Sequence, residues 1–175
     1  LSYKGQLPNL LKNLILNNKE KEMGMYPGGN IIKLTPSDLT AAAHTAGDVL
    51  FAKNELKNAV PSRGGCSLLR NVTAYIEGAA SDDDWVLMFF DNSTDLGAAA
   101  NAAASGITAD EFRTASCIGA MEFNGGNQAF DVGNGLLYTS TESNYGDGPL
   151  LLKAADGETS IWVAAINYAG TVDLT

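Results

Sequence analysis

The sequence is poor in histidine and cysteine, and this shortage excludes several kinds of chemistry. Its 175 residues include one histidine, His44, and two cysteines, Cys66 and Cys117. A serine or cysteine nucleophile needs an oriented base, and a single imidazole in an alanine-rich segment is more typical of a structural or surface residue. One histidine and two distant cysteines do not make a tetrahedral zinc site. We therefore expect a protein that is not an enzyme and that has no metal and no cofactor.

Basic residues are also scarce. The chain has 11 Lys and Arg against 20 Asp and Glu, which gives a net charge of -9 and a pI of about 4.4. A nucleic-acid binder needs a Lys/Arg surface that releases counterions from phosphates. We therefore expect no direct nucleic-acid partner, and the few cations, notably Arg63 and Arg70, become candidates for specific contacts with a protein partner.

Long hydrophobic runs and cysteine pairs are missing as well. No apolar run approaches the roughly 18 to 20 residues of a membrane helix, and no signal-peptide pattern is present. Two cysteines could form at most one disulfide, and without a C-x-x-C pair two buried free thiols in a reducing compartment are the more ordinary arrangement. We expect a soluble protein that does not bind membranes and is not secreted by the usual route.

The first 30 residues predict an arm ahead of the main domain. Leu7, Leu10, Leu11 and Leu14 form one apolar stripe at helical spacing. The following segment, residues 24–30, is rich in Gly and Pro and cannot continue a helix. Residues 1–30 are therefore expected to be a short amphipathic helix with a linker, which either folds back on its own domain or binds a neighbouring subunit.

Residues 31–175 are predicted to form one mainly β domain, a β-sandwich or a jelly-roll-like fold. Short β-like runs alternate with Gly-rich turns, and about nine strands are expected. The runs are Ile31 to Leu34, Leu39 to His44, Asp48 to Ala52, Glu55 to Val60, Cys66 to Glu77, Trp85 to Asp91, Ser116 to Phe123, Leu136 to Thr141, Leu150 to Ala154 and Thr159 to Ala169.

Three segments stand out within this domain. Residues 85–90 are apolar at every position, which predicts a central strand covered on both sides or an interface strand. Thr108 and Glu111 fit a capping box, so a short helix is expected from Ala109 to about Thr114. Residues 98–105 are nearly all alanine and predict a mobile or closely packed loop, with an alanine helix as the alternative.

Two further patterns were weighed for chemistry. Asp82, Asp83 and Asp84 could offer oxygen ligands to Ca²⁺, but they lack EF-hand spacing, and a solvated turn is the better interpretation. A carbohydrate-binding or glycan-hydrolysing sandwich would use exposed aromatic side chains with carboxylates. Its candidates are Trp85, Trp162, Tyr138 and Tyr145, although core packing is the default for the two tryptophans.

Several strand and turn segments resemble a family of tailed-bacteriophage virion structural proteins. They are residues 47–51, Asn58-Ala59-Val60-Pro61-Ser62-Arg63-Gly64-Gly65-Cys66-Ser67-Leu68-Leu69, Asp95-Leu96-Gly97, residues 149–154 and residues 159–163. In order, they span roughly residues 47 to 169.

The resemblance implies a capsid decoration, or cement, protein. Such a protein is a β-sandwich subunit on the outside of the virion shell, often a homotrimer, whose partner is the major capsid protein. It would be made in the host cytoplasm. A head-fibre, neck or tail component is the alternative virion role. The candidate contacts with coat protein are Leu7, Leu10, Leu11, Leu14, Arg63 and Arg70, because a detachable apolar stripe and rare cations suit binding through avidity.

Overall fold

A computed structural model of the chain describes residues 31–38, 43–77, 84–140, 149–169 and 171–173. The chain divides into two units, Leu1–Ile31 and Ile32–Thr175, and every element named below belongs to the second. The predicted helical arm, with Leu7, Leu10, Leu11 and Leu14, lies outside the described residues and stays a prediction. None of the helices in the described ranges is long and apolar enough to cross a membrane.

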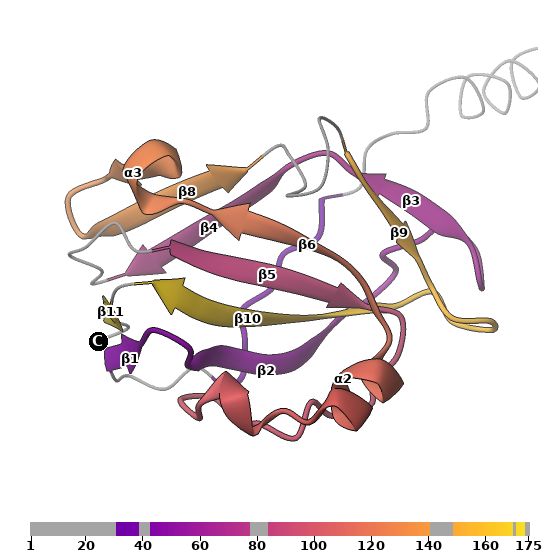
Figure 1. The fold of residues 1–175 in the computed structure, drawn as a ribbon. Helices are drawn as coiled ribbons and strands as arrows, with labels where there is room; N and C mark the ends of the chain where they lie inside the picture. Colours follow the sequence, from indigo (N-terminus) through magenta and orange to yellow (C-terminus); the bar gives the residue numbers. More distant parts are fainter. Residues whose placement is uncertain (1–30, 39–42, 78–83, 141–148, 170, 174–175) are drawn as a thin grey trace, which may run out of the picture. The chain divides into compact units, whose positions relative to one another are not determined.

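The first layer of the domain is a four-stranded antiparallel sheet in the order β2-β10-β5-β6 (Figure 1). Its strands are β2 (Val49–Leu56), β10 (Ile161–Ala169), β5 (Asp84–Phe90) and β6 (Cys117–Phe123). β5 pairs with β10 on one side and with β6 on the other. The prediction that the apolar segment 85–90 forms a central strand is therefore confirmed.

The second layer consists of two smaller antiparallel sheets. One has the order β4-β8-β7, from β4 (Val72–Glu77), β8 (Gly135–Ser140) and β7 (Ala129–Asp131). The other pairs β3 (Cys66–Leu69) with β9 (Leu150–Lys153). Both sheets contribute side chains to the core beneath them, so the predicted mainly β, sandwich-like fold is confirmed.

The main core lies between the two layers. It joins Trp85, Leu87 and Phe89 of β5 to Tyr138 of β8 and Leu152 of β9. These five side chains alternate with residues that face the other way, which is the period of two expected for strands. Trp85 stacks on Phe123 with ring centroids 4.0 Å apart and an interplanar angle of 5°.

A second apolar cluster lies on the other face of the four-stranded sheet. Met88 and Phe90 of β5 pack there against Leu96 and Ala115. Leu96 and Ala115 belong to the segment 91–116, which contains the 3-10 helix η1 (Ala104–Gly106) and the helix α2 (Ala109–Ala115). Because β5 is covered on both faces, it can be apolar at successive positions.

The sequence predictions for this covering segment hold. The Thr108 hydroxyl accepts a hydrogen bond from the Glu111 amide, and the Glu111 carboxylate accepts one from the Thr108 amide, so the capping box is present. Residues 98–103 form a loop packed along β2 rather than an alanine helix, because the Val49 amide donates to the Ala102 carbonyl and the Asn101 amide to the Val49 carbonyl, and Ala104 and Ser105 begin η1.

Other strand predictions need correction. Residues 31–34 form no strand, and Glu55 to Val60 is not a separate strand, because β2 continues to Leu56 and a turn follows. The run from Cys66 to Glu77 is split at Arg70 and Asn71 into β3 and β4.

Besides the 3-10 helix η1, three elements were not predicted. They are β7, the one-turn helix α3 (Gly125–Gln128), and β11 (Thr171–Asp173), which pairs with β1 (Ala43–Thr45).

Candidate interaction surface

The outer face of the β3–β9 ribbon is apolar in its middle. Leu68 and Leu151 lie directly opposite each other in the strand register, and their side chains are 55% and 56% exposed. Their neighbours Ser67 and Leu152 are paired in the same register, and Leu152 faces the core. The alternation therefore aims one leucine pair at solvent, where two large side chains stay hydrated.

The outer face of the β4-β8-β7 sheet carries a second apolar group. Tyr75 of β4 pairs with Leu137 of β8, which in turn pairs with Phe130 of β7, so the three side chains form one row across the sheet. Tyr75 and Phe130 are 52% and 55% exposed, and Val132, just after β7, is 51% exposed. The Tyr75 hydroxyl donates to the Asn134 carbonyl at the edge of this group.

Both apolar groups lie on the outer surface of the second layer, and we call this surface the outer face. Nine large hydrophobic side chains are exposed among the described residues, and five of them, Leu68, Tyr75, Phe130, Val132 and Leu151, are on the outer face. The opposite surface of the domain differs because the segment 91–116 covers the four-stranded sheet there. Exposed hydrophobic residues that gather on one face are typical of a surface that binds another molecule.

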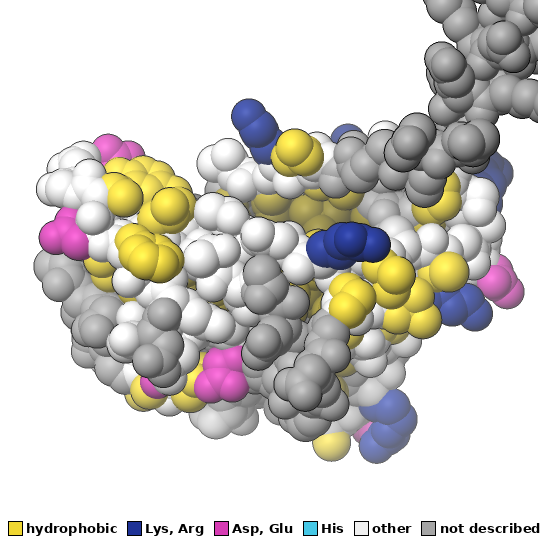
Figure 2. Space-filling view, turned by 90° about the horizontal axis from the view of Figure 1, so that it is seen from above, with side chains coloured by type: hydrophobic (Ala, Val, Ile, Leu, Met, Phe, Trp, Pro, Cys, Tyr) yellow, Lys and Arg dark blue, Asp and Glu magenta, His cyan; other side chains and the backbone are white. Residues whose placement is uncertain are grey.

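Charged side chains are also exposed along the outer face. At the β3–β9 end, Lys153 is opposite Cys66, and Arg70 continues the outward alternation beyond Leu68; both cations are exposed. At the β7–β8 end Glu77 is exposed on the outer face, whereas Asp131 is paired with the core residue Leu136 and lies on the other side of the edge strand β7. Figure 2 views this side of the molecule: yellow groups and magenta groups lie at both ends, and dark blue groups lie toward the centre and right.

These charged groups are not neutralised within the described part of the domain. No ion pair in that part involves Arg70, Lys153, Glu77 or Asp131, and its two ion pairs are Lys57 with Glu55 and Arg113 with Asp110. Glu77 accepts a hydrogen bond from the Asn134 side chain, and Asp131 accepts one from the Gly133 amide. The β3–β9 end also adjoins the exposed Asp156 and Glu158 of the turn after β9, so charges of both signs lie beside the apolar group there.

The candidate contacts named from the sequence are placed differently. Arg70 belongs to the outer face. Arg63 is exposed on the turn before β3, where the Gly64 amide donates to the Glu158 carbonyl at 2.8 Å and Gly64 has a φ of +65°. A side chain at Gly64 would contact Asp156 at 3.3 Å. Arg63 therefore lies beside an acidic turn and is separate from the row of outward-facing side chains.

The sequence analysis did not identify Leu68, Leu151 and Lys153 as surface residues. The alternation of the four residues of β3 was the sequence pattern that could have indicated an outward-facing side chain there.

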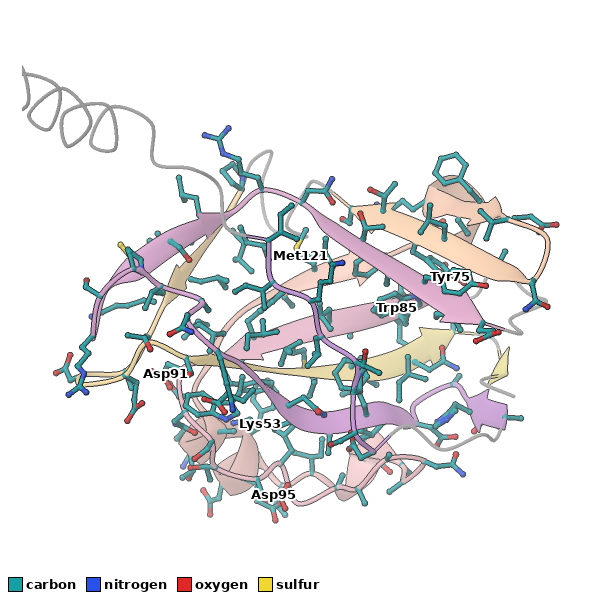
Figure 3. The ribbon with its side chains drawn as sticks, turned by 180° about the vertical axis from the view of Figure 1, so that it is seen from behind. Lys53, Tyr75, Trp85, Asp91, Asp95 and Met121 are labelled. Atoms are coloured by element: carbon teal, nitrogen blue, oxygen red, sulfur yellow. The ribbon has the colours of Figure 1, made fainter. Side chains whose placement is uncertain are left out.

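A second polar site lies on the other side of the domain, around Lys53 of β2. The Lys53 ammonium donates hydrogen bonds to the Asn92 carbonyl at 3.1 Å and to the Ala115 carbonyl at 3.0 Å, and it lies 4.1 Å from the centroid of the Phe90 ring. Burial lowers the pKa of Lys53 to about 8, against the raising influence of Asp91, Cys117 and Asp95. Figure 3 shows Lys53 directed toward the segment that carries the two aspartates.

The Lys53 site is best understood as a clamp. Its donors are taken up by carbonyls at both ends of the covering segment, including the last turn of α2, where a cation also complements the helix dipole. It therefore fixes the segment 91–116 to the sheet.

The aromatic candidates for sugar binding are largely internal. Trp85 and Tyr138 are 3% and 1% exposed and pack against each other at 5.6 Å, Trp162 is half-buried, and Tyr145 lies outside the described residues. Two of the four side chains therefore cannot contact a glycan at the surface.

The remaining candidates for chemistry are also placed. His44 is fully buried in β1. Of the two roles expected from the sequence, structural or surface residue, it therefore has the structural one. Asp84 accepts a hydrogen bond from the Gly125 amide and begins β5, whereas Asp82 and Asp83 lie outside the described residues. Within the described ranges, no three His, Cys, Asp or Glu side chains come together to hold a metal ion.

The cysteines are free, but the expectation that both are buried is wrong. Cys66 is exposed and Cys117 is half-buried. Cys66 takes an outward position of β3 opposite Lys153, because the strand alternation places Ser67 and Leu69 inward instead.

Comparison with known proteins adds no relative. No protein-family description, no curated protein and no solved structure matches this chain.

Proposed function

We propose that this chain is a non-enzymatic structural subunit of a phage virion, which binds major capsid protein on the outside of the shell and stabilises it. The observation that carries the proposal is the outer face, where five exposed hydrophobic side chains gather beside unpaired charges. A surface of this kind suits binding to protein rather than to a small substrate.

The rest of the support comes from the sequence. The strand and turn segments between residues 47 and 169 resemble virion structural proteins, and the stripe Leu7, Leu10, Leu11 and Leu14 is a second apolar surface. Weak contacts with several coat subunits multiply through effective concentration, so a small subunit with separate binding elements attaches firmly to a lattice and weakly to a single coat protein. In this proposal the arm and Arg63 contact the shell.

The test is binding to particles of the phage that encodes the chain. Purified protein is mixed with assembled empty shells and, separately, with free coat protein, and the bound fraction is measured by sedimentation. We expect saturable binding to shells and little to free coat protein. Equal binding to both, or none to either, contradicts the proposal. Many copies spread over the shell support decoration, whereas a few copies at one vertex or on the tail point to a fibre, neck or tail component.

The arm is tested by a matched pair of variants. The first variant removes the apolar stripe by replacing Leu7, Leu10, Leu11 and Leu14 with serine. The second variant leaves the stripe intact and replaces four polar residues of the arm with serine, namely Asn13, Asn17, Lys19 and Lys21. We expect reduced shell occupancy in the first variant only. Unchanged occupancy in both shows that the arm serves another purpose.

A further inference from the structure

We infer that Asn134 is a site of spontaneous deamidation, where the side-chain amide is lost as ammonia and a new carboxylate appears beside Glu77. The inference concerns the chemistry of one turn and does not depend on the proposed function. Asparagine is followed by glycine at two places in the sequence, Asn124-Gly125 and Asn134-Gly135. Because glycine has no side chain and turns freely, these are the two asparagines at which the reaction is least hindered by the next residue.

The reaction consumes water and releases ammonia. The backbone nitrogen of the glycine attacks the side-chain carbonyl carbon, Cγ, of the asparagine. A nitrogen–carbon bond forms, the Cγ–Nδ2 bond breaks, and the amide nitrogen leaves as ammonia with the proton of the glycine N–H. Water then opens the five-membered imide. Opening at Cγ gives aspartate, whereas opening at the backbone carbonyl gives isoaspartate, in which the chain continues through Cγ. The glycine nitrogen must therefore be free to act as the nucleophile.

The structure protects Asn124. The Gly125 amide donates a hydrogen bond to the Asp84 carboxylate at 2.9 Å, and Gly125 begins α3. Asn124 is half-buried, and its own amide donates to the Gln128 side chain at 2.7 Å. Attack by the Gly125 nitrogen would break a hydrogen bond to a charged group, which is one of the stronger kinds, so Asn124 should react slowly.

The turn between β7 and β8 leaves Asn134 open to the reaction. Asn134 is exposed. The Val132 amide donates to the Gly135 carbonyl at 3.1 Å, but the reverse bond, from the Gly135 amide to the Val132 carbonyl, is not among the turn bonds of the described residues. The Tyr75 hydroxyl donates at 3.2 Å to the Asn134 carbonyl, which shares one peptide group with the Gly135 nitrogen. Because a hydrogen bond polarises the peptide group that accepts it, this contact makes the Gly135 N–H more acidic.

Close packing keeps glycine at position 135. A Cβ there would collide with the Ile76 carbonyl oxygen and would lie 3.0 Å from the Glu77 Cα in β4. A larger residue that would slow the attack therefore does not fit after Asn134. The reactive pair is a consequence of the close approach of β8 to β4.

Deamidation changes the contact between Asn134 and Glu77. The Asn134 amide nitrogen donates to the Glu77 carboxylate at 3.2 Å, and after the reaction two carboxylates, which repel each other, face one another there. In isoaspartate the backbone also gains one methylene group in the turn. β7 has a strand neighbour, β8, on one side only, so we expect this edge strand to loosen in the product.

The test is incubation of the purified full chain near neutral pH, followed by proteolysis and mass spectrometry. Conversion is measured at each asparagine from the mass gain of amide to acid, and isoaspartate is labelled with protein isoaspartyl methyltransferase. Asn134→Gln and Asn124→Gln are the matched variants, because a glutamine would have to close a larger ring that forms slowly. Asp84→Ala frees the Gly125 amide. Circular dichroism verifies that each variant is folded.

We expect Asn134 to convert about tenfold or more faster than Asn124 in the folded wild type, since attack at Asn124 loses a charged hydrogen bond. The two rates should become similar when the chain is unfolded in urea. Asn134→Gln should remove the main modification, Asn124→Gln should leave it, and Asp84→Ala should raise the rate at Asn124 only. Conversion at Asn124 that equals or exceeds conversion at Asn134 in the folded chain overturns the inference, and so does the absence of conversion at both sites.

The effect of the new charge is measured on Asn134→Asp, which reproduces the direct product. This variant should unfold at a lower temperature than the wild type. Adding Glu77→Gln should restore the loss, because the glutamine amide can donate to the new carboxylate. A loss that Glu77→Gln does not reduce contradicts repulsion at Glu77 as its cause.

Discussion

The ammonium nitrogen of Lys53 lies 4.1 Å from the centroid of the Phe90 ring, on the side of the sheet that the segment 91–116 covers. The ring, the Asn92 carbonyl and the Ala115 carbonyl together surround this one cation. These contacts attach the 26-residue segment 91–116 to strand β2. Burial of the ammonium group lowers the pKa of Lys53 to about 8.

The stability of the domain should therefore rise with pH between about 8 and 9. The folded state binds fewer protons at Lys53 than the unfolded state, whose pKa is 10.5, so raising the pH through this window favours folding. Above 9.0 the raised pKa of the Cys117 thiol, caused by burial, acts in the opposite direction. Because Lys53 is partly exposed, solvent screening keeps the rise well below about 1.4 kcal/mol per pH unit.

Urea unfolding at several pH values measures this effect. Lys53→Met should lower stability at every pH, since two carbonyls lose their donor, and should also abolish the rise between pH 8 and 9. The same slope in the wild type and in Lys53→Met would show that another group is responsible.

The two thiols should react at different rates. Cys66 is exposed, whereas Cys117 is half-buried, donates a hydrogen bond to the Gly119 carbonyl, and has a pKa raised by burial. Since the thiolate is the reactive form, a thiol reagent near pH 8 should modify Cys66 about tenfold or more faster than Cys117. Stopped-flow absorbance on Cys66→Ser and Cys117→Ser separates the two phases, and a fast phase that survives in Cys66→Ser would contradict the assignment.

Loss of the capping box should destabilise the domain. Thr108→Ala removes the side-chain acceptor for the Glu111 amide at the start of α2, which costs about 1 kcal/mol. Arg113→Ala is the control in the same helix, because it breaks only the exposed ion pair with Asp110 and should change stability by less than about 0.5 kcal/mol. Chemical denaturation distinguishes the two, and equal effects would mean that the cap does not contribute.

Adjacent leucines of β9 should behave oppositely. Leu152→Ala opens a cavity in the main core and should cost about 2 to 5 kcal/mol. Leu151→Ala removes an exposed side chain and should change the stability of the domain by less than about 0.5 kcal/mol. A large loss of monomer stability in Leu151→Ala would place this side chain in the core instead.

Much of the local structure could be predicted because it depends on neighbours in the sequence. The capping pair Thr108 and Glu111 starts a helix through bonds three residues apart, and the continuous apolar run in β5 indicates burial on both sides. Cationic Arg70 could be singled out by its rarity. The free state of the cysteines followed from their number and spacing.

The interaction surface could not be predicted in the same way. Leu68 and Leu151 are 83 positions apart in the sequence numbering and become one apolar pair only through the register of β3 with β9. Tyr75, Leu137 and Phe130 likewise meet through two separate strand pairings. No local sequence pattern indicated that Cys66 is exposed. The exposure of this thiol depends on which face of the β3–β9 ribbon is covered by the rest of the domain.

The sequence alone determined the strand-rich character, the capped helix and the acidic balance of this protein, because propensity, periodicity and charge are properties of short segments. The tertiary structure decided which residues share a face. Strand pairing joins distant segments, and the covering segment 91–116 hides one side of the four-stranded sheet. Only after that burial is settled do the remaining apolar and charged side chains of the second layer form a single surface.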